Sequence, residues 1–483
     1  MTRVATGEVI PLAVLPEDWF YTYMKLTSGK SEYALLESGR GGRYSVIGLD
    51  PFAKLTGKDG QLTVEQEGQV EYLKGPLLQS LRQWISAWAI EADPELPDMQ
   101  GGLFGQLSYD LIREIESLPV SASDDLDTPD VSLLAFDELY VIDHREELLW
   151  GIAVTEDRTD HRVAKALLDR WHHTAAALDQ EVFSALRDTK EKERERLRSL
   201  DEKTFQEGVH RVQDYIRSGD VFQVNISVRE TRPLITSPRH MYQKLREINP
   251  SPYMGYFQKD GIVFVSASPE LLVKVRGEDV STRPIAGTRS RGDSPEEDDR
   301  LARTLLDNEK ERAEHIMLVD LERNDLGRIA AFGTVTVDEL MVIEKYSHVQ
   351  HIVSNVKGKR ASNKDAFDVI AATFPGGTIT GAPKIRTMEI IEEIEPVRRG
   401  AYTGAMGWIG FQGDMELNIT IRTMIVKDEE VHVQAGAGIV IDSDPAAEYK
   451  ESLKKAKALW HAKAMSEEEL LGQLSKSRGG ENK

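Results

Sequence analysis

The chain has 483 residues, of which 40% are hydrophobic and 29% are charged, a balance typical of soluble globular proteins. Its 81 acidic residues outnumber its 60 basic residues and give a formal net charge of −21, which argues against nucleic acid as a partner because nucleic-acid backbones require basic grooves. The chain contains no cysteine, which excludes disulfides, thiolate nucleophiles and cysteine-bound metals and fits a reducing compartment.

The N-terminal region is a poor match to a secretory signal. Its apolar run, 9–15, is short and lies between Glu8 and Glu17, whereas a secretory signal needs a basic start and a longer apolar stretch. No run approaches the roughly 20 apolar residues that cross a bilayer. We therefore expect a cytoplasmic protein with no membrane partner, and the length predicts two large lobes or domains.

The first part of the chain, 1–185, mixes short strand-like runs with loops. Strands are expected at 132–136 and 139–142, where apolar runs are bounded by charged or turn residues. One helix is expected at 75–88, where leucine, tryptophan and isoleucine recur at helical spacing. The densely charged stretch 186–203 predicts a solvated linker or helix between this part and the next.

The second part, 204–466, alternates strands with strong helices. Helices are expected at 299–326 and 366–374, and strands at 262–265 and 406–411. A hairpin-like pair, 417–427 followed by 431–435, favours an antiparallel α+β layered fold over a doubly wound parallel sheet. The polar tail, 467–483, is expected to be disordered.

Two helical stretches carry paired carboxylates. Glu311 and Glu314 are three residues apart, so both project from one helix face, and Glu448 and Glu451 repeat that spacing, with Lys455 four residues further on. Four carboxylates on two facing helices suit a hard, oxygen-loving cation such as Mg²⁺. Taken alone, each pair is more commonly an ordinary set of surface charges.

Three glycine-bearing segments accompany these carboxylates. The segment 374–383 leads into a helix and offers free N–H groups with the hydroxyls of Thr378 and Thr380, which suit a carboxylate or phosphate. The segments 434–439 and 283–292 add further backbone donors, without side-chain obstruction at their glycines. Each segment alone could be only a turn, but together with the carboxylates they indicate a composite site for an anion.

At this point the sequence resembles a known family. The strings at 283–289, 315–325, 377–384 and 434–438 resemble those of the chorismate-utilising enzymes, which include anthranilate, aminodeoxychorismate, isochorismate and salicylate synthases. The similarity is continuous from about 204 to 464 and weaker in the first third. It implies a two-lobed α+β fold in which largely antiparallel β-sheets pack face to face with helices outside, and it implies Mg²⁺ as the cofactor and chorismate as the substrate.

The resemblance also assigns roles to individual residues. Glu314 and Glu451 correspond to direct Mg²⁺ ligands, with Glu311 and Glu448 close by or bound through water. Glu270 corresponds to the general acid that protonates the departing C4 hydroxyl of chorismate, a role that requires a carboxyl protonated near neutral pH. The remaining residues are expected to bind the enolpyruvyl carboxylate (Tyr402, Arg422, Gly438 and Lys455) or to line the ring (Thr378, Gly436, Gly287 and His351).

Gln223 bears on the nucleophile. Isochorismate and salicylate synthases resemble one another in placing a lysine general base at this position, so its replacement by glutamine predicts ammonia rather than water as the nucleophile. The alternative is that Gln223 is an ordinary buried amide. Because the chain has no cysteine, it lacks the thiol of a glutaminase, and the resemblance implies that a separate glutamine amidotransferase subunit supplies the ammonia.

The product is less sharply predicted than the substrate. Some aminodeoxychorismate synthases carry a lysine that attacks C2 covalently at the position of Ala286. Anthranilate synthases resemble this chain in having alanine there. Details around the other motifs resemble a Bacillus-type subunit for para-aminobenzoate synthesis, which also has alanine there. We therefore expect 4-amino-4-deoxychorismate, with anthranilate and pyruvate as the alternative product and a catalytically silent binding relative as a third hypothesis.

A second ligand site is implied by two further segments. Residues 35–38 and 249–254 resemble those that form the tryptophan pocket of the family, so the resemblance makes Glu37, Ser38, Tyr253 and Met254 candidate residues of such a pocket. Whether tryptophan would regulate the protein or serve its structure is left open by the sequence.

Overall fold

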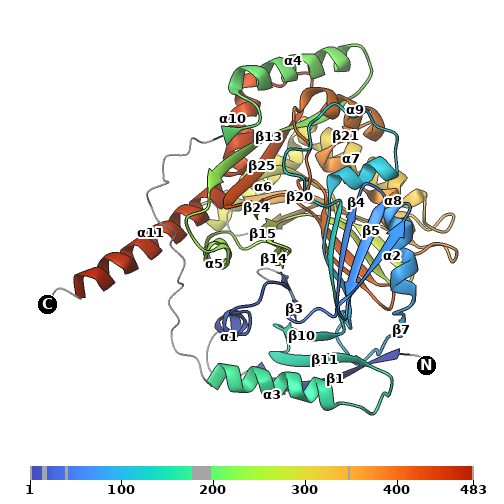
Figure 1. The fold of residues 1–483 in the computed structure, drawn as a ribbon. Coiled ribbons are helices and arrows are strands. Elements are labelled where there is room, and N and C mark those ends of the chain that lie inside the picture. Colours follow the sequence, from blue (N-terminus) through green and yellow to red (C-terminus); the bar gives the residue numbers. More distant parts are fainter. Residues whose placement is uncertain (1–2, 13–18, 39–41, 177–196, 346–348, 481–483) are drawn as a thin grey trace.

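The protein is described by a computed structural model that covers residues 3–12, 19–38, 42–176, 197–345 and 349–480. Two large β-sheets form its centre, and helices cover their outer faces (Figure 1). Neighbouring strands in both sheets run antiparallel, apart from β1 and β7, which pair in parallel. This arrangement confirms the predicted α+β class with largely antiparallel sheets.

Sheet A draws strands from both halves of the chain. Its strands, in spatial order, are β12 (Leu197–Arg198), β13 (Gln223–Pro233), β25 (Glu430–Ile439), β24 (Thr423–Lys427), β15 (Ile262–Ser268), β14 (Tyr253–Lys259), β2 (Tyr33–Glu37), β3 (Tyr44–Gly48), β10 (Glu138–Asp143), β11 (Leu148–Thr155), β1 (Arg3–Pro11) and β7 (Ile90–Glu91). The short strand β21 (Gly381–Ala382) also pairs with β13.

Sheet B is equally mixed. Its strands, in spatial order, are β18 (Ile285–Ser290), β20 (Val349–Lys359), β17 (Asp279–Thr282), β16 (Leu271–Arg276), β23 (Met415–Ile419), β22 (Ala405–Gly410), β8 (Gly102–Leu107), β9 (Val131–Phe136), β4 (Ala53–Lys58), β5 (Gln61–Gln66) and β6 (Gln69–Lys74), while β19 (Thr336–Lys345) pairs with β20. Because each sheet uses strands from before and after residue 186, the first part of the chain is not a separate folding unit.

The two sheets pack face to face through one apolar layer. Ala34 and Val141 of sheet A meet Phe104, Leu134 and Met406 of sheet B in a single buried cluster. Alternate residues of each strand point into this layer, as the period of a β-strand requires. The predicted face-to-face packing is thereby confirmed.

Helices bury the outer faces of both sheets. Sheet A is covered by α1 (Trp19–Leu26), α3 (Arg162–Ala176), α5 (Pro238–Ile248) and α11 (Lys457–Gly480). Sheet B is covered by α2 (Leu77–Ser86), α7 (Glu309–Gly327) and α8 (Ala366–Thr373), with the 3₁₀ turn Tyr109–Glu114 beside them. At one end, α4 (Glu202–Arg217), α9 (Lys384–Ile394) and α10 (Pro445–Lys455) pack on β13 and β25. No helix within the described ranges has the length and apolar content to span a bilayer.

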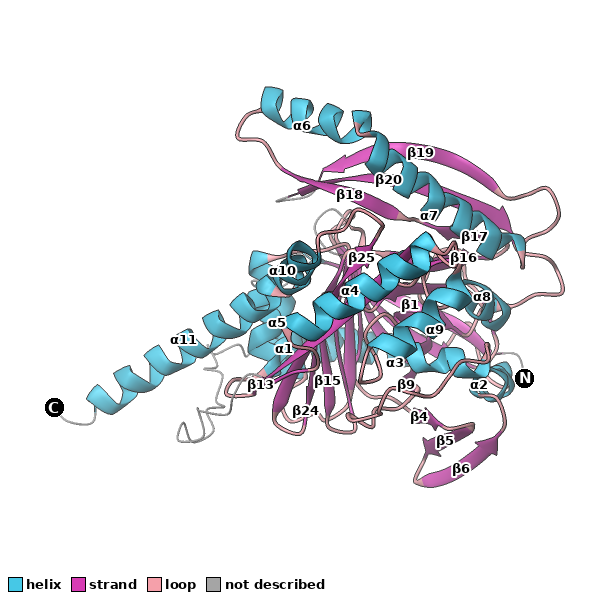
Figure 2. Cartoon of the chain, turned by 90° about the horizontal axis from the view of Figure 1, so that it is seen from above, coloured by secondary structure: helices cyan, strands magenta, loops and turns pink. Residues whose placement is uncertain are grey.

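Three predicted elements differ from the structure. The helix expected at 299–326 is two helices, α6 (Pro295–Asp307) and α7, because Asn308 leaves the helical conformation and its side chain accepts a hydrogen bond from the N–H of Glu311. Figure 2 shows α6 and α7 alongside β18, β19 and β20. The tail expected to be disordered is helical to Gly480, and Leu470 is buried.

The third difference concerns the strand expected at 417–427. It is two strands in two sheets: β23 belongs to sheet B, and β24, which forms the predicted hairpin with β25, belongs to sheet A. The chain changes sheets at 420–422. Of the predicted linker, 186–196 lies outside the described residues, and the rest contains β12 and the start of α4.

Candidate active site

The chain crosses between the sheets at two points that lie side by side. One crossing leads from β15 through Glu270 into β16, and the other leads from β23 through Arg422 into β24. Ile419 N–H donates to the carbonyl of Glu270 at 3.0 Å, and Ala267 N–H donates to the carbonyl of Arg422 at 3.0 Å. The sheet exchange therefore brings Glu270 and Arg422 to one place, and Arg422 adopts a φ of 51° there.

Glu270 is a buried carboxyl with an unusual proton affinity. Only 7% of the residue is exposed, and burial raises its pKa to about 7, against smaller opposing contributions from Thr378, the N–H of Ile285 and Lys455. Within the described part of the chain, neither Oε1 of Glu270 nor Oγ1 of Thr378 completes a hydrogen bond. The carboxyl is thus about half protonated at pH 7, and Oε1 is left for a ligand, as a general acid requires.

Thr378 sits in a short 3₁₀ turn, Gly377–Ile379, that is tied to sheet A. The carbonyl of Thr380 accepts from the N–H of Asn225, and β21, which follows, pairs with β13. A Cβ at Gly377 would lie 1.9 Å from the side chain of Leu321, so only glycine lets the turn pack against α7. This contact explains the glycine at position 377.

The cationic side of the site consists of Arg422 and Lys455, together with the buried side chain of Tyr402. Burial lowers the pKa of Arg422, and Tyr402 and Glu451 oppose this effect. Nζ of Lys455 donates to the carbonyl of Gly436 at 3.0 Å and pairs with Glu451 at 3.0 Å. Two cations beside a buried tyrosine can hold a carboxylate, and a guanidinium can do so through two hydrogen bonds.

Gly287 and His351 lie on the paired strands β18 and β20 of sheet B. Gly287 has a φ of 61°, and a Cβ there would lie 2.8 Å from Oε2 of Glu311, so glycine is required both by the backbone and by the nearby carboxylate. Nδ1 of His351 lies 3.1 Å from the carbonyl of Gly287, and burial lowers the pKa of His351. The imidazole is therefore neutral at physiological pH.

The four predicted metal-binding carboxylates lie on two neighbouring helices. Burial raises the pKa of Glu314, and the charges of Glu311, Glu448 and Glu451 raise it further, while Lys310 lowers it. Glu314 on α7 therefore lies within electrostatic range of Glu448 and Glu451 on α10. Burial likewise raises the pKa of Glu448.

The carboxylates do not form a closed ligand cluster. No three acidic or histidine side chains among the described residues are close enough to hold one ion. Glu311 instead pairs with Arg289 at 3.1 Å, and Glu451 pairs with Lys455. Two of the four carboxylates are therefore paired with cations in this structure, and their convergence on one ion stays a prediction. The donor set still fits a hard divalent cation, since it consists of carboxylate oxygens that repel one another.

The structure adds one residue that sequence reasoning missed. Arg399 is 3% exposed and pairs with Glu395 through two hydrogen bonds of 2.7 and 3.0 Å. It also donates to the carbonyls of Ile379, at 2.9 Å, and Asn225, at 2.8 Å. One guanidinium thus joins the 3₁₀ turn that carries Thr378 to the strand that carries Gln223. In sequence, Arg398-Arg399 reads as an ordinary surface pair.

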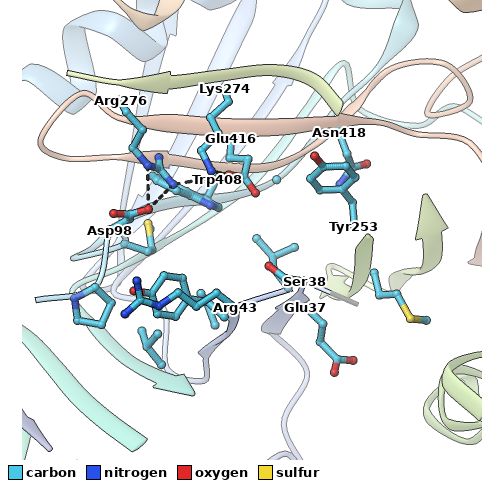
Figure 3. A pocket seen from close by; sticks show the side chains of 18 residues that line it. Glu37, Ser38, Arg43, Asp98, Tyr253, Lys274, Arg276, Trp408, Glu416 and Asn418 are labelled. Carbon is cyan, nitrogen blue, oxygen red and sulfur yellow. Dashed lines mark hydrogen bonds and ion pairs between the residues drawn. The ribbon is translucent and has the colours of Figure 1, made fainter. Parts of the chain in front are cut away.

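A separate cavity of about 300 Å³ lies between the sheets, and Figure 3 shows its lining. Glu37, Ser38, Tyr253 and Met254, the residues expected to form a tryptophan pocket, all line it. Its walls come from β2 and β14 of sheet A and from β16, β22 and β23 of sheet B. Its size is at the small end of the range found for small-molecule sites.

Charges in this cavity are largely paired within the protein. Glu37 accepts two hydrogen bonds from Arg246, at 2.7 and 2.9 Å, and Arg276 pairs with Asp98 at 2.9 Å (Figure 3). Oδ1 of Asn418 is buried and has no hydrogen-bond partner within the described ranges. The cavity therefore offers apolar surface, an amide and paired charges, which suits a small amphipathic ligand.

Comparison with known proteins decides the family. A family model described as chorismate binding enzyme matches residues 31–461. This chain belongs to the chorismate-binding enzyme family. The recognition made from the glycine-bearing and acidic motifs is thereby confirmed.

Individual relatives of this chorismate-binding enzyme cover most of its length. It is 48% identical over 473 residues to aminodeoxychorismate synthase component 1 of Bacillus subtilis (strain 168), covering 97% of this chain and 98% of that protein. It is 45% identical to anthranilate synthase component 1 of Thermus thermophilus, covering 92% and 95%. Among solved structures, anthranilate synthase component I from Streptococcus pneumoniae TIGR4 superimposes with a TM-score of 0.73 at 36% identity, covering 87% and 92%.

Proposed function

We propose that this chain is a cytoplasmic, Mg²⁺-dependent enzyme that aminates chorismate to 4-amino-4-deoxychorismate, using ammonia from a glutamine amidotransferase subunit. The observation that carries the proposal is a buried carboxyl that can give a proton, in a chain with no lysine at position 223. Glu270 offers a proton near neutral pH, and β13 presents the amide of Gln223 rather than a lysine. The pocket thus has an acid for a departing hydroxyl and, on that strand, no amine to activate water.

The substrate is held by its two carboxylates. Arg422, Tyr402 and Lys455, with the bare backbone of Gly438, receive the enolpyruvyl carboxylate. Thr378, Gly436, Gly287 and His351 line the ring. Glu314 and Glu451, with Glu311 and Glu448 nearby, would hold Mg²⁺, which when bound neutralises the ring carboxylate.

The reaction balances with these groups. Glu270 gives its proton to the C4 hydroxyl, which leaves as water while the nitrogen of ammonia forms the new bond to C4. The new ammonium group then loses a proton, which restores the carboxyl of Glu270. Chorismate and ammonia thereby become 4-amino-4-deoxychorismate and water, without the covalent lysine route, because position 286 is alanine.

Anthranilate formation is the second candidate. The 45% identity to the Thermus anthranilate synthase component supports it, as does Ala286. Both reactions need the same acid, cations and ammonia, so the residues described above serve either product. A catalytically silent relative is disfavoured because every predicted acidic and cationic residue is present.

Product analysis separates these candidates. The purified chain is incubated with chorismate, Mg²⁺ and ammonium at alkaline pH, and the products are resolved by liquid chromatography with a coupled pyruvate assay. We expect aminodeoxychorismate, which a separate lyase converts to para-aminobenzoate, without release of pyruvate by the chain itself. Prompt formation of anthranilate with stoichiometric pyruvate would replace the first proposal by the second.

Glu314→Ala tests the metal assignment. We expect turnover to fall at least about 100-fold, because a carboxylate ligand and its charge are lost. The dependence of rate on Mg²⁺ concentration is measured for the variant and for Asp320→Ala, which removes an exposed carboxylate from the same helix. A Glu314→Ala enzyme with normal turnover and normal Mg²⁺ dependence would remove Glu314 from this role.

The cavity between the sheets is proposed to bind L-tryptophan. At a concentration 100 times its dissociation constant, the ligand stabilises the folded state by about 2.7 kcal/mol and raises the melting temperature by roughly 2–3 °C for a chain of this length. Ser38→Phe, which fills the cavity, should abolish the rise, and D-tryptophan serves as the matched ligand control. An equal rise for both enantiomers would contradict a specific site.

A further inference from the structure

The strand β13 has two faces with different tasks. Val224, Ile226 and Val228 pack into the core formed with α4 and α9, so the alternate residues Gln223, Asn225 and Ser227 point to the other face. On the partner strand β25, Ala437 and Ile439 belong to the same core, which places Gly436 and Gly438 on the face that carries Gln223 and Asn225. Two side-chain amides therefore stand beside two glycines.

Both amides lie tightly against this bare backbone. A Cβ at Gly438 would lie 2.1 Å from Nε2 of Gln223, and a Cβ at Gly436 would lie 2.7 Å from Oδ1 of Asn225. Asn225 pairs directly with Gly438 in the ladder. The two amides thus fill the space that a side chain at 436 or 438 would need. They lie next to the carbonyl of Gly436, which accepts a hydrogen bond from Lys455.

Asn225 presents an acceptor without a partner. The residue is 8% exposed, and its Oδ1 is buried and accepts no hydrogen bond from any described residue. Leaving a buried polar atom unpaired costs about 1–3 kcal/mol. A buried acceptor of this kind is satisfied if a ligand supplies the missing donor.

The position of Asn225 is fixed by its backbone. Its N–H donates to the carbonyl of Thr380 at 2.9 Å, and its carbonyl accepts from Arg399 at 2.8 Å. Each of these partners is itself buried. The strand therefore holds the amide in place before any ligand arrives, which is how binding sites are preorganised.

We propose that Asn225, with Gln223 beside it, forms the binding subsite for neutral ammonia in the amination reaction. The inference rests on the proposed function, in which ammonia is the nucleophile. Ammonia has three N–H donors and one lone pair, so an acceptor such as Oδ1 of Asn225 can bind an N–H and leave the lone pair free for attack on the ring.

The chemistry of the amide suits this task better than a carboxylate would. A carboxylate favours ammonium, whose lone pair is occupied by a proton, whereas a neutral amide does not select for the cation. Lys455, whose Nζ donates to the carbonyl of the neighbouring Gly436, further disfavours a cation by like-charge repulsion. The subsite therefore selects the reactive form of the nucleophile.

Asn225→Val tests the subsite, because valine is tolerated in strands and removes the acceptor. We expect the KM for free ammonia to rise about tenfold, the effect of one lost hydrogen bond, while the dissociation constant for chorismate, measured without ammonia, changes less than twofold. Asn225→Ser keeps one acceptor oxygen and should give an intermediate KM. Asn355→Val, which removes an asparagine from β20 that bonds to Asp338, should leave the KM for ammonia unchanged.

Each outcome bears on the proposal. A KM for ammonia that rises in the order wild type, Ser, Val supports it, whichever aminated product forms. An unchanged KM in the Val or Ser variant overturns it, as does an equal loss of chorismate affinity, which would make Asn225 a substrate-binding or structural residue. If the wild-type enzyme consumes chorismate with water and not with ammonia, the proposed function itself fails, and this result is seen before any variant is made.

Discussion

Glu270→Gln should lower the turnover of chorismate with ammonia by about 100-fold or more, because the variant has no proton to give to the departing C4 hydroxyl. The substitution preserves the shape of the side chain, and binding of chorismate should persist. Rates are measured at a fixed concentration of free ammonia, and chorismate affinity is measured separately. A variant with near-normal turnover would show that another group protonates the hydroxyl.

The pH dependence follows from the raised pKa of Glu270, about 7. A general acid works in its protonated form, so kcat/KM for chorismate in the wild-type enzyme should fall as pH rises above about 7 when free ammonia is held constant. The Gln variant should lack this limb. Without the correction for free ammonia, the growing supply of nucleophile would hide the effect.

The raised pKa of Glu270 also predicts that Glu270→Gln, which lowers activity, raises the stability of the folded state at alkaline pH. A buried carboxyl whose pKa is raised from 4.5 to about 7 destabilises the folded state progressively as pH rises through that window, and fully above it. Glu270→Gln removes this cost, so at pH 8 the variant should be more stable by about 3 kcal/mol, while at pH 4 the two proteins should be alike. Chemical denaturation at both pH values measures the difference in the free energy of unfolding between the two proteins. The contributions of the other buried carboxyls cancel in this difference because both proteins contain them.

Local patterns predicted most elements of the fold but not their partners. The apolar run at 406–411 and the hairpin around 428–429 are found nearly where expected, because strand period and turn residues are local signals. The change of sheets at 420–422 was not predictable from the alternating pattern. It depends on Ala267 and Glu270, which lie some 150 residues away in sequence and hydrogen-bond across the crossing.

In the candidate site, too, the residues could be predicted from the sequence but their long-range partners could not. Spacing and family resemblance supplied the candidate residues, and the structure shows electrostatic interaction between Glu270 and Lys455 and of Arg422 with Tyr402 and Glu451. The pairing of Glu311 with Arg289 could not be predicted, because the arginine lies on another element. The unpartnered oxygen of Asn225 was equally invisible, since only the folded strand shows which of its atoms lacks a donor.

Arg399→Met should destabilise the protein by about 3–5 kcal/mol, because it leaves the buried carboxylate of Glu395 without its counter-ion. It also removes the donors to the carbonyls of Ile379 and Asn225. Urea denaturation measures the loss. Arg323→Met breaks an exposed ion pair with Asp320 at 2.8 Å and should cost less than about 1 kcal/mol.

Activity separates a role in positioning from stability alone. Under conditions where both proteins are folded, Arg399→Met should lower kcat/KM for chorismate about 10–100-fold, because the strand with Gln223 and the turn with Thr378 lose their common anchor. In a double-mutant cycle with Glu395→Gln, the coupling free energy should reach about 1–3 kcal/mol. If Arg399 aligns the strand with Gln223 and the turn with Thr378, its loss must move the groups that these two segments carry. A destabilised variant with unchanged kcat/KM would therefore show that Arg399 is a purely structural residue.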